Sequence, residues 1–143
     1  MKIGLIHSLD FAEEALEIKR QIEEKGHSVS LCYSVSKIKE GELSVQKILD
    51  LKNSGEFFEY TISKDLIKWN YERLKKDDAI LVINLAKKGI DNYIGGNTFL
   101  EMGFAYVLAK KIFLWQDISE MIYTDEIKAM QPIVLNRDLN KIK

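Results

Sequence analysis

Glu101 is the residue whose type and surroundings most clearly suggest chemistry. It stands in "YIGGNTFLEMGFAYVLAKKIFLW" (residues 93–115), where every other residue from Thr98 to Ala109 is apolar, small or an uncharged hydroxyl. A carboxylate is costly to bury there unless a partner neutralises it or the protein uses it. The spacing leaves two interpretations open. Glu101 pairs with a lysine, an arginine or a backbone donor, or it acts as a nucleophile or as the partner of a developing oxocarbenium ion.

The residues just before Glu101 also have two interpretations. Gly95 and Gly96 permit unusual backbone angles, and Asn97 is a natural N-cap. Such a turn can present N–H groups to a phosphate or a sugar hydroxyl, or it can simply begin a helix. With Asn97 as the cap, Glu101 lies one turn into the helix, where the helix dipole favours a carboxylate.

A second candidate loop, "HSLD" (residues 7–10), follows the first apolar run. Ser8 can bind a phosphate or sugar oxygen, and His7 can project into the same crevice. The alternatives are that Ser8 or Asp10 caps the next helix and that His7 is a hydrogen-bonded loop residue.

The elements that must position these residues alternate between strands and helices. Apolar runs predict strands at residues 2–6, 27–35, 79–85, 111–115 and 132–135. Helical spacing predicts helices within residues 11–26, 63–78, 98–109 and 119–130, and a helix of about three turns within 36–60, ending in a loop at 53–55. This order predicts one α/β domain over residues 1–143, a doubly wound (Rossmann/flavodoxin-like) fold with about five parallel strands. Ligands bind at the carboxyl ends of such strands, which selects residues 7–10 and 86–97.

The composition narrows the classes of partner. A formal net charge of −1 gives no electrostatic reason to expect binding to nucleic acid or to an anionic membrane. The single cysteine, Cys32, excludes an intrachain disulfide and a cysteine-rich metal site, and it predicts a buried strand thiol in a cytoplasmic protein. No apolar run has membrane length, and no His, Cys and carboxylate spacing predicts a metal site.

These residues resemble the nucleoside 2-deoxyribosyltransferase superfamily, which includes the deoxynucleoside monophosphate N-glycosidases. The resemblance covers nearly the whole chain and is strongest from residue 66 to residue 115. It rests on an acid before the central strand (Asp78), the glycine loop and "EMGFA". It is closest to small members of the superfamily that share the wording "YIGGNTFLEMGFA".

The resemblance implies that Glu101 is the nucleophile that attacks the anomeric carbon, and that the glycosyl ester then passes to water or to another base. It also implies a homo-oligomer, a dimer or larger, built through "LIKW" and the Glu101 helix, and no cofactor or metal. The expected contacts to a small nucleoside or nucleotide are His7, Ser8, Asp10, Asn70, Asn84, Gly95, Gly96 and Asn97.

The sequence departs from the family pattern at several helper positions. Asn70 replaces an aspartate that contacts the leaving base, and an amide cannot give or take a proton. Gly95 replaces an acidic residue or a phosphate-binding serine, and Gly4 replaces an aromatic hydroxyl on the first strand. His7 replaces the glycine before Ser8. Protonation of the leaving group therefore falls to His7, Asp10 or Asp91.

Two functions follow from these observations. The first is cleavage or exchange of an N-glycosidic bond, with Glu101 as the nucleophile. The second is a nucleotide-binding or nucleoside-binding sensor of the same fold, in which Glu101 only hydrogen-bonds ribose hydroxyls.

Overall fold

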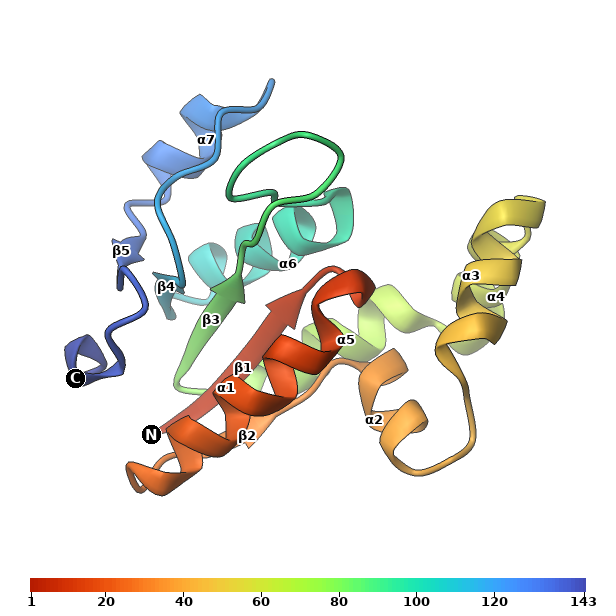
Figure 1. Cartoon of the computed structure of the whole chain (residues 1–143), viewed down its shortest axis with the longest axis horizontal. Helices are drawn as coiled ribbons and strands as arrows, with labels where there is room; N and C mark the ends of the chain where they lie inside the picture. Colours follow the sequence, from red (N-terminus) through yellow and green to blue (C-terminus); the bar gives the residue numbers. More distant parts are fainter.

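The computed structural model describes residues 1–143 and has one sheet of five parallel strands with helices on both faces (Figure 1). The strands are β1 (Lys2–His7), β2 (Ser28–Ser30), β3 (Ala79–Ile83), β4 (Lys111–Leu114) and β5 (Ile133–Val134). Their spatial order, β2-β1-β3-β4-β5, is the flavodoxin-like order of doubly wound sheets. The predicted fold class is confirmed.

The α-helices are α1 (Ala12–Glu24), α2 (Tyr33–Lys39), α3 (Val45–Ser54), α4 (Phe57–Lys64), α5 (Leu66–Lys75), α6 (Gly96–Val107) and α7 (Thr124–Ala129). Two short 3-10 turns are η1 (Leu9–Phe11) and η2 (Leu139–Lys141). None of these helices combines the length and the apolar character needed to cross a bilayer.

Two hydrophobic cores flank the sheet because successive residues of a strand point to opposite faces. Ile3 and Leu5 of β1 pack in the core under α1. Ile6 of the same strand packs in the other core, together with residues of α5, α6 and α7. The central strands β1 and β3 are thus covered on both sides, which fixes the direction in which their carboxyl ends point.

The structure corrects several predicted boundaries. The strand predicted at residues 27–35 ends at Ser30, and Cys32 is the N-cap of α2 rather than a strand residue. The helix predicted at 63–78 is α5 and begins only at Leu66, because residues 63–64 end α4 and Asp65, with a left-handed backbone (φ 48°), separates the two helices. The helix that carries Glu101 begins at Gly96 with Gly95 as its N-cap, so Asn97 is not the cap.

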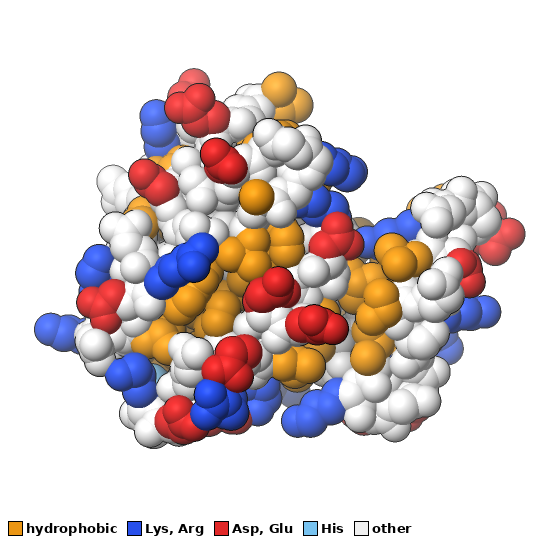
Figure 2. Space-filling view, in the orientation of Figure 1, with side chains coloured by type: hydrophobic (Ala, Val, Ile, Leu, Met, Phe, Trp, Pro, Cys, Tyr) orange, Lys and Arg blue, Asp and Glu red, His pale blue; other side chains and the backbone are white.

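Helices α3 and α4 form a hairpin that stands away from the sheet, here called the α3–α4 arm (residues 45–64) (Figure 1). Gly55 (φ 79°) ends α3 in the left-handed conformation that glycine tolerates best. Apolar side chains on the arm remain exposed, among them Phe58 and Ile62, and the space-filling view shows hydrophobic atoms gathered over it (Figure 2). The arm therefore forms a side wall next to the sheet rather than part of either core.

Gly4 in the middle of β1 marks a close approach between the strand and α5. A Cβ atom on Gly4 would lie 2.5 Å from Asp77 Oδ2 and 3.2 Å from Arg73 Nη1. Ser30 Oγ donates a hydrogen bond to the same Asp77 oxygen at 2.7 Å, so the carboxylate cannot move aside without losing it. The glycine provides the space for these two buried charged side chains.

We expect Gly4→Ala to lower the free energy of unfolding by about 1–3 kcal/mol, the usual cost of overpacking a close-packed core. The measurement is equilibrium unfolding in urea. Gly103→Ala is the matched control, because a Cβ atom there meets nothing within 4 Å and alanine in a helix should stabilise by about 0.5–1 kcal/mol. Equal effects of the two substitutions would contradict the close approach at Gly4.

Candidate active site

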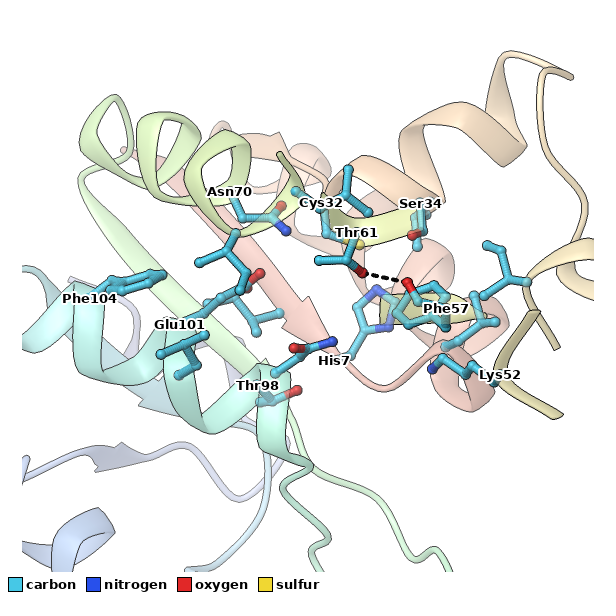
Figure 3. Close-up of a pocket in the computed structure, with 18 residues that line it drawn as sticks. His7, Cys32, Ser34, Lys52, Phe57, Thr61, Asn70, Thr98, Glu101 and Phe104 are labelled. Carbon is cyan, nitrogen blue, oxygen red and sulfur yellow. Dashed lines mark hydrogen bonds between the residues drawn. The ribbon is translucent and has the colours of Figure 1, made fainter. Parts of the chain in front are cut away.

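A cavity of about 100 Å³ opens at the carboxyl end of β1 (Figure 3). Its walls come from β1 and η1, from α2 and the residue before it, from the α3–α4 arm, from α5 and from α6. The 18 lining residues are Ile6, His7, Leu9, Cys32, Ser34, Val35, Ile48, Lys52, Phe57, Thr61, Leu66, Ile67, Asn70, Asn97, Thr98, Leu100, Glu101 and Phe104. Lys52 and Glu101 are the only Lys, Arg, Asp or Glu residues among them, and they come from opposite walls.

Glu101 lies on α6 with its side chain on the cavity wall (Figure 3). The residue is only 7% exposed. One carboxylate oxygen, Oε2, lies 3.5 Å from Arg73 Nη2 of α5, whereas no protein hydrogen bond reaches Oε1. Glu101 therefore has the cationic neighbour that the first interpretation expects, and it also faces a cavity.

Arg73 belongs to a buried polar group behind Glu101. Its Nη1 donates to Ser30 Oγ at 3.0 Å and lies 3.8 Å from Asp77 Oδ2. At the outer end of the group, Lys2 Nζ lies 3.6 Å from Asp77 Oδ1. The group thus runs from the surface lysine to the cavity wall and holds the guanidinium in one position.

Burial raises the pKa of Glu101 to about 7, and the nearby Arg73 only partly opposes this rise. Removal from water penalises the charged form of a carboxyl group, and an adjacent cation favours it. The expected stabilisation by the helix dipole does not prevent this net rise. A carboxyl group with such a pKa is present in both its charged and its neutral form near neutral pH, and perturbed carboxyl groups of this kind cluster at functional sites.

His7 is held as a neutral imidazole at the centre of the cavity wall (Figure 3). Its Nδ1 lies 2.8 Å from the Ser8 carbonyl oxygen and must donate to it, because a carbonyl oxygen only accepts. Burial lowers the pKa of His7. The other nitrogen, Nε2, is buried without a hydrogen-bond partner and carries a free lone pair.

The structure brings together only some of the residues that the sequence nominated. Glu101, His7, Asn70 and Asn97 line the cavity. Asn70 Oδ1 accepts a long hydrogen bond of 3.4 Å from the Tyr33 backbone.

Ser8 and Asp10 do not line the cavity and instead engage Lys87. Lys87 Nζ donates to Ser8 Oγ at 2.7 Å and lies 3.1 Å from Asp10 Oδ2. Both side chains therefore contact an ammonium group that belongs to the loop after β3.

Asn84, Gly95 and Gly96 lie outside the cavity lining. Asn84 is fully buried and joins the ends of β3 and β4, because it accepts from Gln116 N and donates to Asp117 O, both at 2.8 Å. Gly95 has an extended backbone (φ −76°), and neither glycine has a positive φ. The expectation that this pair supplies unusual backbone angles is wrong.

Sequence reasoning missed Arg73, Asp77 and the arm residues that line the cavity, such as Lys52 and Phe57. The sequence did contain a signal for the first two, since Arg73 and Asp77 stand four residues apart while a glycine interrupts the apolar run of β1. Asp78, the acid matched to the family pattern, is exposed and accepts from Lys2 N at 2.6 Å. No group of three or more His, Cys, Asp and Glu side chains is arranged to hold a metal ion.

We expect Glu101→Gln to change how stability depends on pH. The pKa of Glu101 in the folded protein, about 7, is above its usual 4.5, so the folded state binds more protons between these values. The wild type should therefore lose stability, by about 3 kcal/mol in all, as pH rises from 4.5 to 7, and Glu101→Gln should not.

Urea unfolding at pH 4.5 and pH 8 gives the change in the free energy of unfolding with pH for each protein. Comparing these changes cancels any pH-independent difference in stability between the wild type and Glu101→Gln. Glu13→Gln, at an exposed carboxylate without an ion pair, is the control and should stay within about 0.5 kcal/mol of wild type at both pH values. Parallel behaviour of wild type and Glu101→Gln would rule out an unusual titration of Glu101.

Comparison with known proteins finds four similar chains among the solved structures. No protein-family model matches the chain, and no curated protein matches its sequence. The solved structure described as the CMP N-glycosidase BcmB of Clostridium botulinum is similar with a TM-score of 0.47 and 17% sequence identity, over 94% of this chain and 85% of that one. At this level of similarity, nothing about activity passes from that protein to this chain.

Proposed function

We propose that this protein breaks the N-glycosidic bond of a nucleoside or nucleotide, with Glu101 as the nucleophile. One observation carries the proposal: a buried carboxylate with a pKa near 7 lines a cavity, and one of its oxygens has no protein partner. A poorly solvated carboxylate is a better nucleophile than one in water, because fewer solvent contacts must be broken before it attacks. The sequence resemblance assigns the same role to this glutamate.

The first step forms a glycosyl ester. Glu101 Oε1 bonds to the anomeric carbon, the C–N bond breaks, and its electron pair leaves with the base. The departing base takes one proton from solvent. The enzyme is left as a neutral ester of Glu101, as in retaining glycoside hydrolysis.

In the second step a water molecule attacks the anomeric carbon and the ester bond breaks, so that its electron pair returns to Glu101. His7 Nε2 is suited to accept the proton of that water, because it carries a lone pair and has no other partner. Of the three residues expected to protonate the leaving base, His7, Asp10 and Asp91, only His7 lines the cavity, and in its neutral form Nε2 carries a lone pair rather than a proton. Neither step uses a cofactor.

Recognition of the base is assigned to Asn70 and the apolar walls. The Asn70 NH₂ group makes no protein hydrogen bond and can donate to a base edge, while Oδ1 can accept. Phe104 and Phe57 supply aromatic surface at two sides of the cavity (Figure 3). An apolar pocket with a few polar groups is the usual form of a small-molecule site.

We also propose a homo-oligomer, at least a dimer, that covers the mouth of this cavity. Ile67 and Leu100 line the cavity and yet remain exposed, as does the neighbouring Trp69. These are residues of the "LIKW" segment and of the Glu101 helix, the two regions expected at an interface. Burying them against a second copy would remove apolar surface from water.

A panel of nucleosides, deoxynucleosides and their monophosphates tests the proposal by chromatographic detection of free base. We expect release by the wild type and a loss on the order of 10³-fold or more in Glu101→Gln, because the nucleophile is removed. Glu13→Gln, at an exposed carboxylate that is not part of the cavity lining, is the control and should retain the rate. Intact-protein mass after rapid quenching should show the added glycosyl group in the wild type and in Glu13→Gln but not in Glu101→Gln.

Binding of a nucleoside or nucleotide without any release of base would overturn the enzyme and identify the sensor instead. That alternative has an observation in its favour, since Glu101 already contacts Arg73 and is partly protonated near pH 7. A protonated glutamate can hydrogen-bond ribose hydroxyls without attacking the anomeric carbon.

A further inference from the structure

The guanidinium of Arg73 divides its two ends between two different carboxylates. Nη2 faces Glu101 Oε2 at 3.5 Å, while Nη1 faces Ser30 Oγ at 3.0 Å and Asp77 Oδ2 at 3.8 Å. Ser30 bridges the second contact, because its hydroxyl donates to the same Asp77 oxygen at 2.7 Å. The arginine is thus anchored on the side away from the cavity and offers its other end to Glu101.

The buried charges of this group do not balance when Glu101 is ionised. Arg73, Asp77 and Glu101 are all buried. The fourth member, Lys2, has a side chain that is 41% exposed, so water screens most of its charge. Two buried carboxylates therefore share one buried cation.

We propose that Arg73 is the positioning residue of this site: anchored by Asp77 and Ser30, it favours the ionised form of Glu101 and aims the carboxylate into the cavity, and it pairs with Asp77 alone once Glu101 has become an ester. This inference rests on the proposed function for the ester, but the ionisation of Glu101 can be measured without any substrate. Formation of the ester removes one negative charge from the group and leaves Arg73 and Asp77 as a neutral pair.

The length of the Arg73–Glu101 contact fits this role. Strong arginine–carboxylate pairs are bidentate with N–O distances near 2.7–2.9 Å, whereas this contact is single and 3.5 Å long. The guanidinium therefore favours the charge on Glu101 without occupying both of its oxygens. Oε1 stays free on the side of the cavity, where an anomeric carbon would arrive.

Fold stability does not explain the arrangement. Arg73 Nε and Asp77 Oδ1 are buried without hydrogen-bond partners, and each such atom costs about 1–3 kcal/mol. Buried ion pairs are often no more stabilising than apolar residues of similar size. The strand also has a glycine, Gly4, where a side chain would collide with both members of the pair.

Few other charged groups face Glu101. The remaining titratable residues on the cavity wall are His7 on β1, Cys32 before α2 and Lys52 on α3. Burial lowers the pKa of His7 and raises the pKa of Cys32, so both are mainly neutral at pH 7. Lys52 is on the opposite wall. Arg73 is thus the cation whose removal should change the ionisation of Glu101 most.

The test uses NMR titration of ¹³C-labelled glutamate side chains, with the Glu101 signal identified by its loss in Glu101→Gln. The double variant Arg73→Met/Asp77→Asn removes both charges of the anchor, so that neither Arg73 nor Asp77 is left buried without the other. Its Glu101 midpoint should rise by about one pH unit or more. Asp77→Asn alone keeps Arg73 and removes the competing carboxylate, so the midpoint should move in the opposite direction, downward.

Lys75→Met is the matched control, because Lys75 is a basic residue of the same last turn of α5 that pairs with Glu72 at the surface. Its midpoint should equal that of the wild type. Unchanged midpoints in both anchor variants would overturn the proposal, and so would shifts in the same direction.

The rate of base release from a preferred substrate gives a second measurement. If the Glu101 midpoint rises by one pH unit, kcat/KM of the double variant should be about fivefold below that of the wild type at pH 7 and should return to the wild-type value above pH 9. A merely structural defect would not give this pH dependence. A loss of equal size at every pH would overturn the positioning role. If the wild type releases no base while the midpoints shift as expected, the proposed function fails and the control of Glu101 ionisation by Arg73 stands.

Discussion

The competition of two buried carboxylates for one arginine is the constraint on which the rest of this structure depends. Arg73 reaches Glu101 and Asp77 at the same time only because β1 has no side chain at Gly4. The strand, the helix α5 and the helix α6 must therefore meet at one point with correct register. Burial raises the pKa of Glu101 to about 7 and Arg73 partly opposes the rise, so this residue of the core still carries a negative charge part of the time near neutral pH.

The sequence predicted the architecture well because the sheet is built from apolar runs. The runs at residues 2–6 and 79–85 could only be buried strands, and they became β1 and β3 at the centre of the sheet. The edge was harder to predict. "HSVSLCYSV" alternates throughout, but only residues 28–30 find a neighbouring strand, and Tyr33 begins a helix that packs Val35 into the core. Asp65 divides α4 from α5 through one left-handed residue, for which the helical spacing gave no warning.

The sequence pointed to the central residue of the candidate site but not to the residues that support it. Glu101 could be found because a single charged residue in an apolar helix stands out in the sequence alone. Arg73 could not, because "ERLKKDD" offers three basic and three acidic positions that look alike until α5 is placed against β1 and β2. Asn84 shows the converse, since a polar residue at the end of the central strand suggested a ligand contact, whereas its amide is used to hold β4 beside β3.

The α3–α4 arm has a consequence for how this protein can diversify. The wall of the cavity that bears His7 and Glu101 is part of the sheet and of α6, so substitutions there disturb the fold as well as the site. The opposite wall, with Ile48, Lys52, Phe57 and Thr61, belongs to a hairpin that contributes little to either core. Evolution, or a laboratory library confined to that hairpin, can therefore change which molecule the cavity admits. The wall that bears His7 and Glu101 and the rest of the fold would stay unchanged.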